Sequence, residues 1–316
     1  MRVIIDTDPG IDDALAIFYL AATPGVEIVA IGSAHGNASS AQSAANALCV
    51  LAQAGRVDVP VAVGAGRPLA QSVETAEFIH GHDGLAGMST STPGVEPVAG
   101  SAAEQIVRLA RANPGELTVL ALAPLTNLAL AYLLEPELPT LLRSVVVMGG
   151  ALAVPGNITP FAEANVWHDP EAADLVFGAG FDLTLAALDV TGSASADHAW
   201  LAMVADIDDG RARFATALLK HYTEVYTNLF GHEACTLHDP LAAAIAVDPG
   251  LATYADYRLA VELGRGATRG QLLADRRGMT DEQLNNPIGA DRRPARVALT
   301  ADVPAFFDRL LTALRP

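Results

Sequence analysis

Four aspartates lie close together near the N-terminus: Asp6, Asp8, Asp12 and Asp13. A helix that begins here would account for Asp12, because an acidic residue near a helix N-terminus is favoured by ~0.3–1 kcal/mol. The other carboxylates would repel one another unless a cation neutralised their charge. Oxygen ligands without a thiol or an imidazole cluster beside them suit a hard divalent ion such as Ca²⁺ or Mg²⁺. The segment therefore predicts a metal site.

A second chemistry is compatible with the same aspartates. In a HAD-like phosphohydrolase that forms an aspartyl-phosphate, Asp6 would be the nucleophile and Asp8 the acid/base. Such an enzyme needs a basic residue late in the chain to hold the phosphate. The nearest lysine, Lys220, lies in a predicted helix without a phosphate-binding context.

Amide, carboxylate and imidazole side chains also follow the predicted strands further along the chain. They are Asn37, Asn127, Asn157, Glu163, Asn165, His238 and Asp239. Because each hydroxyl of a sugar both donates and accepts hydrogen bonds, amides and carboxylates gathered at strand ends suit a polyhydroxylated ligand.

Short β-branched runs alternate with longer segments rich in alanine and leucine. The runs predict buried strands at Val3–Ile5, Val26–Ile31, Val61–Val63, Leu117–Leu122, Ser144–Met148 and Leu183–Leu188. The segments between and beyond them predict helices at Asp12–Ala22, Ser40–Ala54, Ala102–Ala112, Leu125–Leu134, Pro170–Ala179 and Val303–Leu314, and Ala194–Tyr226 is helix-rich. Tyr257–Val261 and Ala267–Leu273 predict a hairpin against the main sheet.

This alternation predicts an α/β fold: an open, mainly parallel twisted sheet with helices on both faces, a Rossmann-like core, and a small antiparallel extension. We expect one domain over residues 1–316. Ligands of such sheets bind at the carboxyl ends of the strands, where the aspartates and amides stand.

Composition narrows the class of partner. The 19 basic and 36 acidic residues give a formal net charge of −17, which would repel a phosphate backbone and argues against nucleic-acid polymers. Cys49 and Cys235 are too few for a disulfide framework. The N-terminus shows no basic region followed by an apolar segment, and no stretch suits a membrane span. We expect a cytoplasmic protein without a membrane partner.

The string Asp-Thr-Asp-Pro-Gly-Ile-Asp-Asp-Ala at residues 6–14 strongly resembles the nucleoside hydrolase family, the metal-dependent inosine–uridine preferring N-ribohydrolases. The resemblance runs from Val3 to at least Ala242. The same order of Asn37, Asn157, Glu163/Asn165 and His238-Asp239 segments supports it.

The resemblance implies a role for each matching residue. It implies Ca²⁺ ligands at Asp8, Asp13, Asp239 and the backbone carbonyl of Leu122, with Asp8 also the general base. It implies ribose or water contacts for Asp12, Asn37, Asn157, Glu163 and Asn165, and a pocket position for Met148. It places His80 and His238 near the leaving base, and gives Asp6 a structural role.

The implied reaction is Ca²⁺-dependent hydrolysis of the N-glycosidic bond of ribonucleosides, with Asp8 activating a Ca²⁺-bound water and a free purine or pyrimidine base leaving. A non-catalytic nucleoside-binding protein is the remaining alternative. An imidazole with a pKa near ~6.5 could protonate the base, which favours His238 as the acid. Tyr226 could stack on the base or relay the proton. The family is usually dimeric or tetrameric, so we expect a homo-oligomer.

Overall fold

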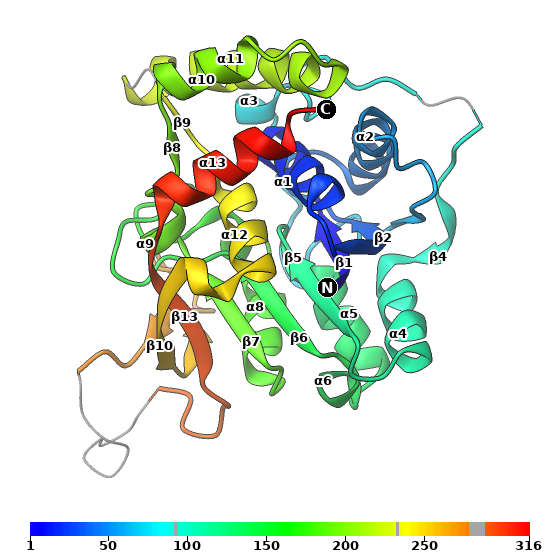
Figure 1. Cartoon of the computed structure of the whole chain (residues 1–316). Helices are drawn as coiled ribbons and strands as arrows, with labels where there is room; N and C mark the ends of the chain where they lie inside the picture. Colours follow the sequence, from blue (N-terminus) through cyan, green and yellow to red (C-terminus); the bar gives the residue numbers. More distant parts are fainter. Residues whose placement is uncertain (92–93, 232–233, 278–287) are drawn as a thin grey trace.

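The computed structural model describes residues 1–91, 94–231, 234–277 and 288–316. Within these ranges nine strands form one sheet in the order β10-β13-β7-β6-β5-β1-β2-β3-β4 (Figure 1). The strands are β1 Arg2–Thr7, β2 Glu27–Ser33, β3 Val61–Val63, β4 Val98–Ser101, β5 Leu117–Ala121, β6 Ser144–Met148, β7 Leu183–Ala186, β10 Ala252–Tyr257 and β13 Ala295–Ala301. Only the edge pair β10–β13 is antiparallel in the described sheet.

Helices cover both faces of this sheet. One hydrophobic core joins it to α1, α2, α11, α12 and α13, and a second joins it to α4, α5 and α8. These helices are α1 Ile11–Ala22, α2 Ser40–Gln53, α4 Ala102–Ala112, α5 Thr126–Leu134, α8 Pro170–Gly178, α11 Gly210–Phe230, α12 His238–Val247 and α13 Val303–Ala313. The shorter helices are α3 Glu77–His80, α6 Leu138–Leu141, α7 Ala164–His168, α9 Leu188–Thr191 and α10 His198–Ala205, with a 3₁₀ turn at Pro249–Leu251. The predicted α/β fold is confirmed.

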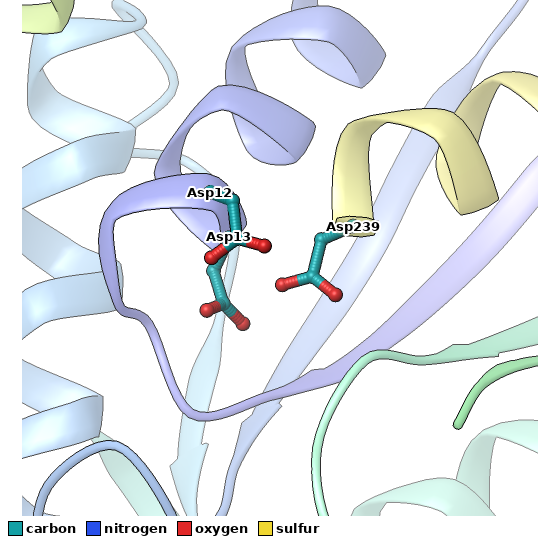
Figure 2. A group of neighbouring side chains, drawn as sticks. All are labelled: Asp12, Asp13 and Asp239. Carbon is teal, nitrogen blue, oxygen red and sulfur yellow. The ribbon is translucent and has the colours of Figure 1, made fainter. Parts of the chain in front are cut away.

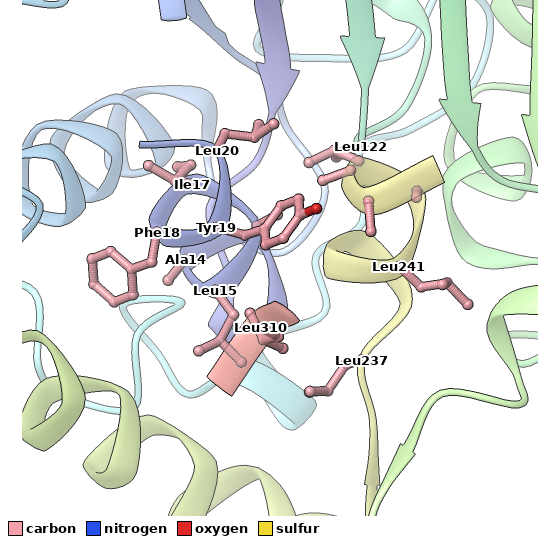
Figure 3. Packing of buried hydrophobic residues seen from close by; sticks show 14 of the residues in the cluster. Ala14, Leu15, Ile17, Phe18, Tyr19, Leu20, Leu122, Leu237, Leu241 and Leu310 are labelled. Carbon is pink, nitrogen blue, oxygen red and sulfur yellow. The ribbon is translucent and has the colours of Figure 1, made fainter. Parts of the chain in front are cut away.

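Strand β1 shows why the central strands read as continuous apolar runs. Val3 and Ile5 belong to one core and Ile4 to the other, and all three are fully buried. Successive side chains of a strand point to opposite faces, so a strand covered on both sides has no solvent-facing position for a polar residue. In the first core, α1 packs against α12 and α13, with Leu15 and Leu310 among the buried contacts (Figure 3).

The order of the strands places a ligand-binding position at the carboxyl edge of the sheet. The chain runs outward from β1 through β2, β3 and β4, and then returns to β5 on the other side of β1. β1 and β5 are paired neighbours, but the chain continues from β1 to β2 on one side and from β5 to β6 on the other. Their carboxyl ends therefore form a topological switch point, where open α/β sheets bind their ligands. The segments after β1, β2, β5 and β6 meet at this edge.

Several boundaries differ from the sequence prediction. The predicted strand Leu183–Leu188 ends at Ala186, because the chain turns at Ala187 and Leu188 begins α9. The predicted hairpin is present as β11 Leu259–Val261 paired with β12 Leu272–Ala274. A second small antiparallel pair joins β8 Ser195–Ala196 to β9 Cys235–Thr236. The strands β4, β10 and β13 were not predicted. Among the helices of the described ranges, none combines the length and the apolar composition of a membrane span.

Candidate active site

Three buried carboxylates meet at the carboxyl edge of the sheet. Asp12 and Asp13 lie in the first turn of α1, and Asp239 lies in the first turn of α12 (Figure 2). One carboxylate oxygen from each lies within 4.8 Å of those of the other two. Burial, together with the charges of Asp12, Asp13 and Asp8, raises the pKa of Asp239 well above its usual value. Buried negative charges this close repel one another, and a bound cation would remove that repulsion.

Asp8 stands beside this group but is not one of the three. Its Oδ2 accepts a hydrogen bond from the backbone N–H of Asn37 at 2.6 Å. Its Oδ1 is buried and has no hydrogen-bond partner among the described residues. A buried carboxylate oxygen without a partner is costly unless something outside the protein binds it. A hard cation fits that requirement.

Asp13 is held by the chain itself. Its Oδ1 accepts a hydrogen bond from the Thr7 hydroxyl, and its Oδ2 accepts from Gly10 N–H at 2.9 Å and from Asn37 Nδ2 at 3.1 Å. These donors fix the orientation of the carboxylate, which is what a metal ligand requires of its neighbours. Asn37 therefore contacts two of the aspartates at once.

A cavity of about 130 Å³ lies at this edge. It is lined by eleven of the residues that the sequence singled out: Asp12, Asn37, His80, Leu122, Met148, Asn157, Glu163, Asn165, Tyr226, His238 and Asp239. Asp8 and Asp13 are buried and do not line it. A larger groove of about 560 Å³ lies between α10 and α11 and holds none of these residues.

The amides and the carboxylate on the β6 side are fixed by the backbone. Glu163 caps α7: its Oε2 accepts from Gly150 N–H at 2.7 Å, and its Oε1 accepts from Asn165 N–H at 2.8 Å. Burial raises the pKa of Glu163. Asn157 Oδ1 accepts from Ala164 N–H at 2.9 Å. These contacts hold the three side chains against the backbone along the cavity.

The carbonyl of Leu122 faces an amide. Asn165 Nδ2 donates to Leu122 O at 3.0 Å and to Met148 O at 3.2 Å. A carbonyl oxygen has two lone pairs, so Leu122 O retains capacity for a second partner such as a cation.

His80 is held as a neutral ring. Its Nδ1 accepts a hydrogen bond from the backbone N–H of Ile11 at 3.1 Å, which leaves the ring hydrogen on Nε2. Burial, followed by the nearby His221 and His238, lowers the pKa of His80 to about 3.

His238 is neutral too, and this corrects a premise of the sequence analysis. Its Nδ1 lies 2.9 Å from Thr191 Oγ1, and that hydroxyl donates to Ala187 O at 3.2 Å. Because the Thr191 hydroxyl donates its hydrogen to Ala187 O, it can only accept from His238. The Nδ1 of His238 therefore carries a hydrogen and donates it to Thr191 Oγ1. Burial lowers the pKa of His238 to about 4 rather than the ~6.5 of an ordinary imidazole. In the free protein the ring is not protonated at neutral pH.

Among the cavity residues that the sequence did not single out are Phe78, Ile79, Ile158 and Tyr222. The Tyr222 ring lies 5.5 Å from the His80 ring and 4.9 Å from the Tyr226 ring, centroid to centroid. A signal was present for Tyr222, because residues four apart on a helix share a face and Tyr226 had been singled out. Phe78 is 62% exposed, and only its position two residues before His80 could have indicated it.

Asp6 does not line the cavity. It is fully buried, its Oδ1 accepts from Asn127 Nδ2 at 2.8 Å, and burial raises its pKa to about 7. No lysine or arginine is among the cavity residues described here. An aspartyl-phosphate mechanism needs an accessible Asp6 and a basic phosphate ligand, so this geometry disfavours the phosphohydrolase alternative.

Comparisons with known proteins agree with the geometry. The model of the family "Inosine-uridine preferring nucleoside hydrolase" matches residues 3–308. The chain is 37% identical to "Probable uridine nucleosidase 2" of Arabidopsis thaliana, over 98% of this chain and 97% of that protein. Among solved structures, "Plant nucleoside hydrolase - PpNRh1 enzyme" superposes with a TM-score of 0.94 at 33% identity, over 99% of this chain and 98% of that one. "Purine-Preferring Ribonucleoside Hydrolase from Gardnerella vaginalis" gives a TM-score of 0.90 at 31% identity, with the same coverage. The chain therefore belongs to the inosine-uridine preferring nucleoside hydrolase family and is an enzyme of that class.

Proposed function

We propose that this enzyme hydrolyses the N-glycosidic bond of ribonucleosides in a Ca²⁺-dependent reaction that yields a free base and ribose. The observation that carries the proposal is the composition of the cavity. Carboxylates and amides that suit a ribose line it together with the rings of His80, Tyr222 and Tyr226, which suit a base.

Four groups would hold the Ca²⁺: the carboxylates of Asp8, Asp13 and Asp239 and the carbonyl of Leu122. The donor set consists of oxygen atoms alone, and it includes the unpartnered Asp8 Oδ1. When bound, the ion would bind the ribose hydroxyls and lower the pKa of the attacking water. Asp12 belongs to the same group of carboxylates, but it lines the cavity, whereas Asp8 and Asp13 do not. Burial and the charge of Asp13 raise its pKa to about 7, against the opposing effect of the backbone N–H groups of Asp239 and His238. We assign Asp12 to the ribose.

Asp8 is the proposed general base. Its Oδ2 is fixed by the N–H of Asn37 and retains a second lone pair, so with Oδ1 on the cation Oδ2 would accept a proton from the water. The bond at C1′ breaks through an oxocarbenium-like transition state, so the sugar must be held while positive charge develops. Asn157, Glu163 and Asn165 orient the ribose, since the chain already fixes each of them.

We propose that His238 protonates the leaving base or donates a hydrogen bond to it. In the free protein its Nδ1 carries the hydrogen shared with Thr191, so Nε2 accepts rather than donates. It can act as an acid only if nucleoside binding brings a proton to the ring. Tyr226 is a second candidate, because it lines the same cavity.

A panel of purine and pyrimidine ribonucleosides, scored for free base, tests the proposal. Uridine is the first member of the panel, because the 37%-identical relative is named a uridine nucleosidase. We expect base release from at least one ribonucleoside. Binding without base release would favour the non-catalytic alternative, and hydrolysis of phosphomonoesters instead would favour the phosphohydrolase.

We also propose a homodimer or homotetramer in the cytoplasm. Analytical ultracentrifugation of the purified chain and fractionation of cells that express it would test these two statements. A monomer in solution would contradict the first.

A further inference from the structure

Asn46 of helix α2 is buried, and its amide is fully used. Its Nδ2 donates to Pro9 O at 2.9 Å and to Asp83 O at 2.7 Å. Its Oδ1 accepts from Gln42 Nε2 at 2.9 Å and from Ser89 Oγ at 2.7 Å. The two backbone carbonyls only accept, so they fix which end of the amide faces them. A buried amide with four partners holds one orientation.

The two carbonyls belong to segments that carry different parts of the site. Pro9 directly follows Asp8 and begins the turn that leads into Asp12 and Asp13. Asp83 begins a loop just after His80. We call residues 9–13 the aspartate turn, and the rings of His80, Tyr222 and Tyr226 the base side of the site. Asn46 therefore links the aspartate turn to the segment that carries His80.

The loop after His80 is braced from within. Asp83 Oδ1 accepts from the N–H groups of Leu85 at 3.0 Å and Gly87 at 2.8 Å, and its Oδ2 accepts from Ser89 N–H at 3.1 Å. The carbonyl of His80 accepts from Ala86 N–H at 2.9 Å. Because these bonds tie the loop to itself and to His80, a displacement of the loop would carry His80 with it.

The contact between Asn46 and this loop leaves no spare room. Gly84 has a φ of +80°, and a Cβ there would lie 2.9 Å from Asn46 Nδ2 and 3.3 Å from Pro9 O. His80 has one direct bond to the aspartate turn, from Ile11 N–H to its Nδ1, and Asn46 holds the loop that follows it. The aspartate turn has several supports that do not involve Asn46. Thr7, Gly10 and Asn37 all bind Asp13.

We propose that Asn46 is a positioning residue for the base side of the site, and that it acts by fixing His80 relative to the aspartate turn. The inference rests on the proposed nucleoside hydrolysis. If it holds, removal of the Nδ2 bonds lets the His80 loop move while the carboxylates stay in place.

The test compares two substrates that share a ribose. A ribonucleoside releases a poor leaving group that needs contacts on the base side, whereas p-nitrophenyl riboside releases a stable anion. Asn46→Asp keeps the shape but replaces the donor, and Asn46→Ala removes the amide. In both we expect kcat/KM for the best ribonucleoside to fall about 10–100-fold more than for p-nitrophenyl riboside, since a misplacement of ~1 Å costs about 10²-fold. Ca²⁺ affinity, measured by calorimetry, should be retained.

Two further variants keep the test decisive if the Asn46 proteins fold poorly. Ser89→Ala removes the hydroxyl that donates to Asn46 Oδ1 and accepts from Gln42 Nε2, and keeps both Nδ2 bonds. It should shift the ratio of the two substrates in the same direction by a smaller factor. Ser43→Ala is the matched control, because Ser43 is buried on the same helix and its Oγ has no partner among the described residues. It should leave the ratio unchanged.

A double-mutant comparison asks whether Asn46 acts through His80. In a His80→Ala background, Asn46→Ala should change the substrate ratio little further, because the group that it positions is gone. Equal losses on both substrates, or effects that add fully in the double mutant, would overturn the inference. A wild-type protein that hydrolyses neither substrate would instead refute the proposed function, so the two failures are distinguishable.

Discussion

The backbone N–H of Asn37 donates to Asp8 Oδ2 at 2.6 Å, although the two residues lie 29 positions apart on neighbouring strand ends. The preceding residue, Gly36, makes this approach possible. Gly36 has a φ of +149°, and a Cβ there would lie 1.9 Å from Asp8 Oδ2. The proposed general base is thus held by a main-chain contact that any side chain at position 36 would prevent.

Gly36→Ala should therefore abolish base release, because the Asp8 carboxylate must move away from Asn37. Gly55→Ala is the control: Gly55 also has a positive φ, +70°, but nothing lies within 4 Å of its Cβ position. That variant should lose about 1 kcal/mol of stability, because a Cβ is disfavoured at positive φ, and should keep its activity. Steady-state assays with thermal unfolding of both proteins would check this. Normal activity of Gly36→Ala would contradict the proposed role of the Asp8 geometry.

The ribose hydroxyls offer a second prediction. A site that pairs buried carboxylates and amides with a hydroxyl leaves them unpaired when the hydroxyl is missing, which costs ~10⁴–10⁵ in kcat/KM. We expect ribonucleosides to be preferred over 2′-deoxyribonucleosides by a factor of this size. Inosine and 2′-deoxyinosine form a matched pair for the measurement. Comparable turnover of inosine and 2′-deoxyinosine would show that Asp12 and its neighbours do not bind the 2′-hydroxyl.

His238→Ala should separate base departure from attack at the sugar. If His238 aids the leaving base, the variant loses about 10²–10⁴-fold in inosine turnover and keeps most of its p-nitrophenyl riboside turnover. His198→Ala, an exposed histidine on α10, serves as the control and should match the wild type. Equal losses on both substrates would assign His238 a structural role.

Burial of His35 should make the free energy of unfolding depend on pH. His35 is fully buried, its Nε2 lies 3.1 Å from Thr126 Oγ1, and burial lowers its pKa to about 4. The unfolded chain has a histidine pKa of ~6.5, so between about pH 6.5 and 4 only the unfolded state takes up this proton. The contribution of His35 to the free energy of unfolding should therefore fall as the pH falls through that window.

Urea unfolding of the wild type and His35→Gln from pH 4.5 to 7 measures this contribution. The difference between the two curves should change by about 1.4 kcal/mol per pH unit at the acidic end, with the wild type losing more stability. Parallel curves would mean that His35 is protonated in both states or in neither.

The features that the sequence predicted are local. The aspartate string is continuous in the chain, and the central strands are buried on both faces, so both appear as uninterrupted patterns. The edge strand β4 was missed because it has only four residues and three of them are exposed, which leaves no apolar run. Strand β13 was missed because it pairs with β10 and β7 at the far edge, and only that pairing gives its residues a buried face.

The remaining features depend on three-dimensional surroundings that a sequence does not contain. The neutral ring of His238 follows from burial and from the contact with Thr191, which lies 47 residues away. Asp12 joins the carboxylate group with Asp239 only because α1 and α12 pack side by side. The link through Asn46 likewise requires α2 to bring one amide to two distant carbonyls.

The central claim is metal-dependent hydrolysis at the aspartate cluster, and base release in phosphate-free buffer tests it most directly. We predict that the Ca²⁺-loaded protein releases base and ribose in equal amounts from its best ribonucleoside, that prolonged chelation abolishes this activity, and that added Ca²⁺ restores it. Asp13→Ala should bind no Ca²⁺ and show no recovery. Base release that persists in verifiably metal-free protein, or in Asp13→Ala, would contradict the account.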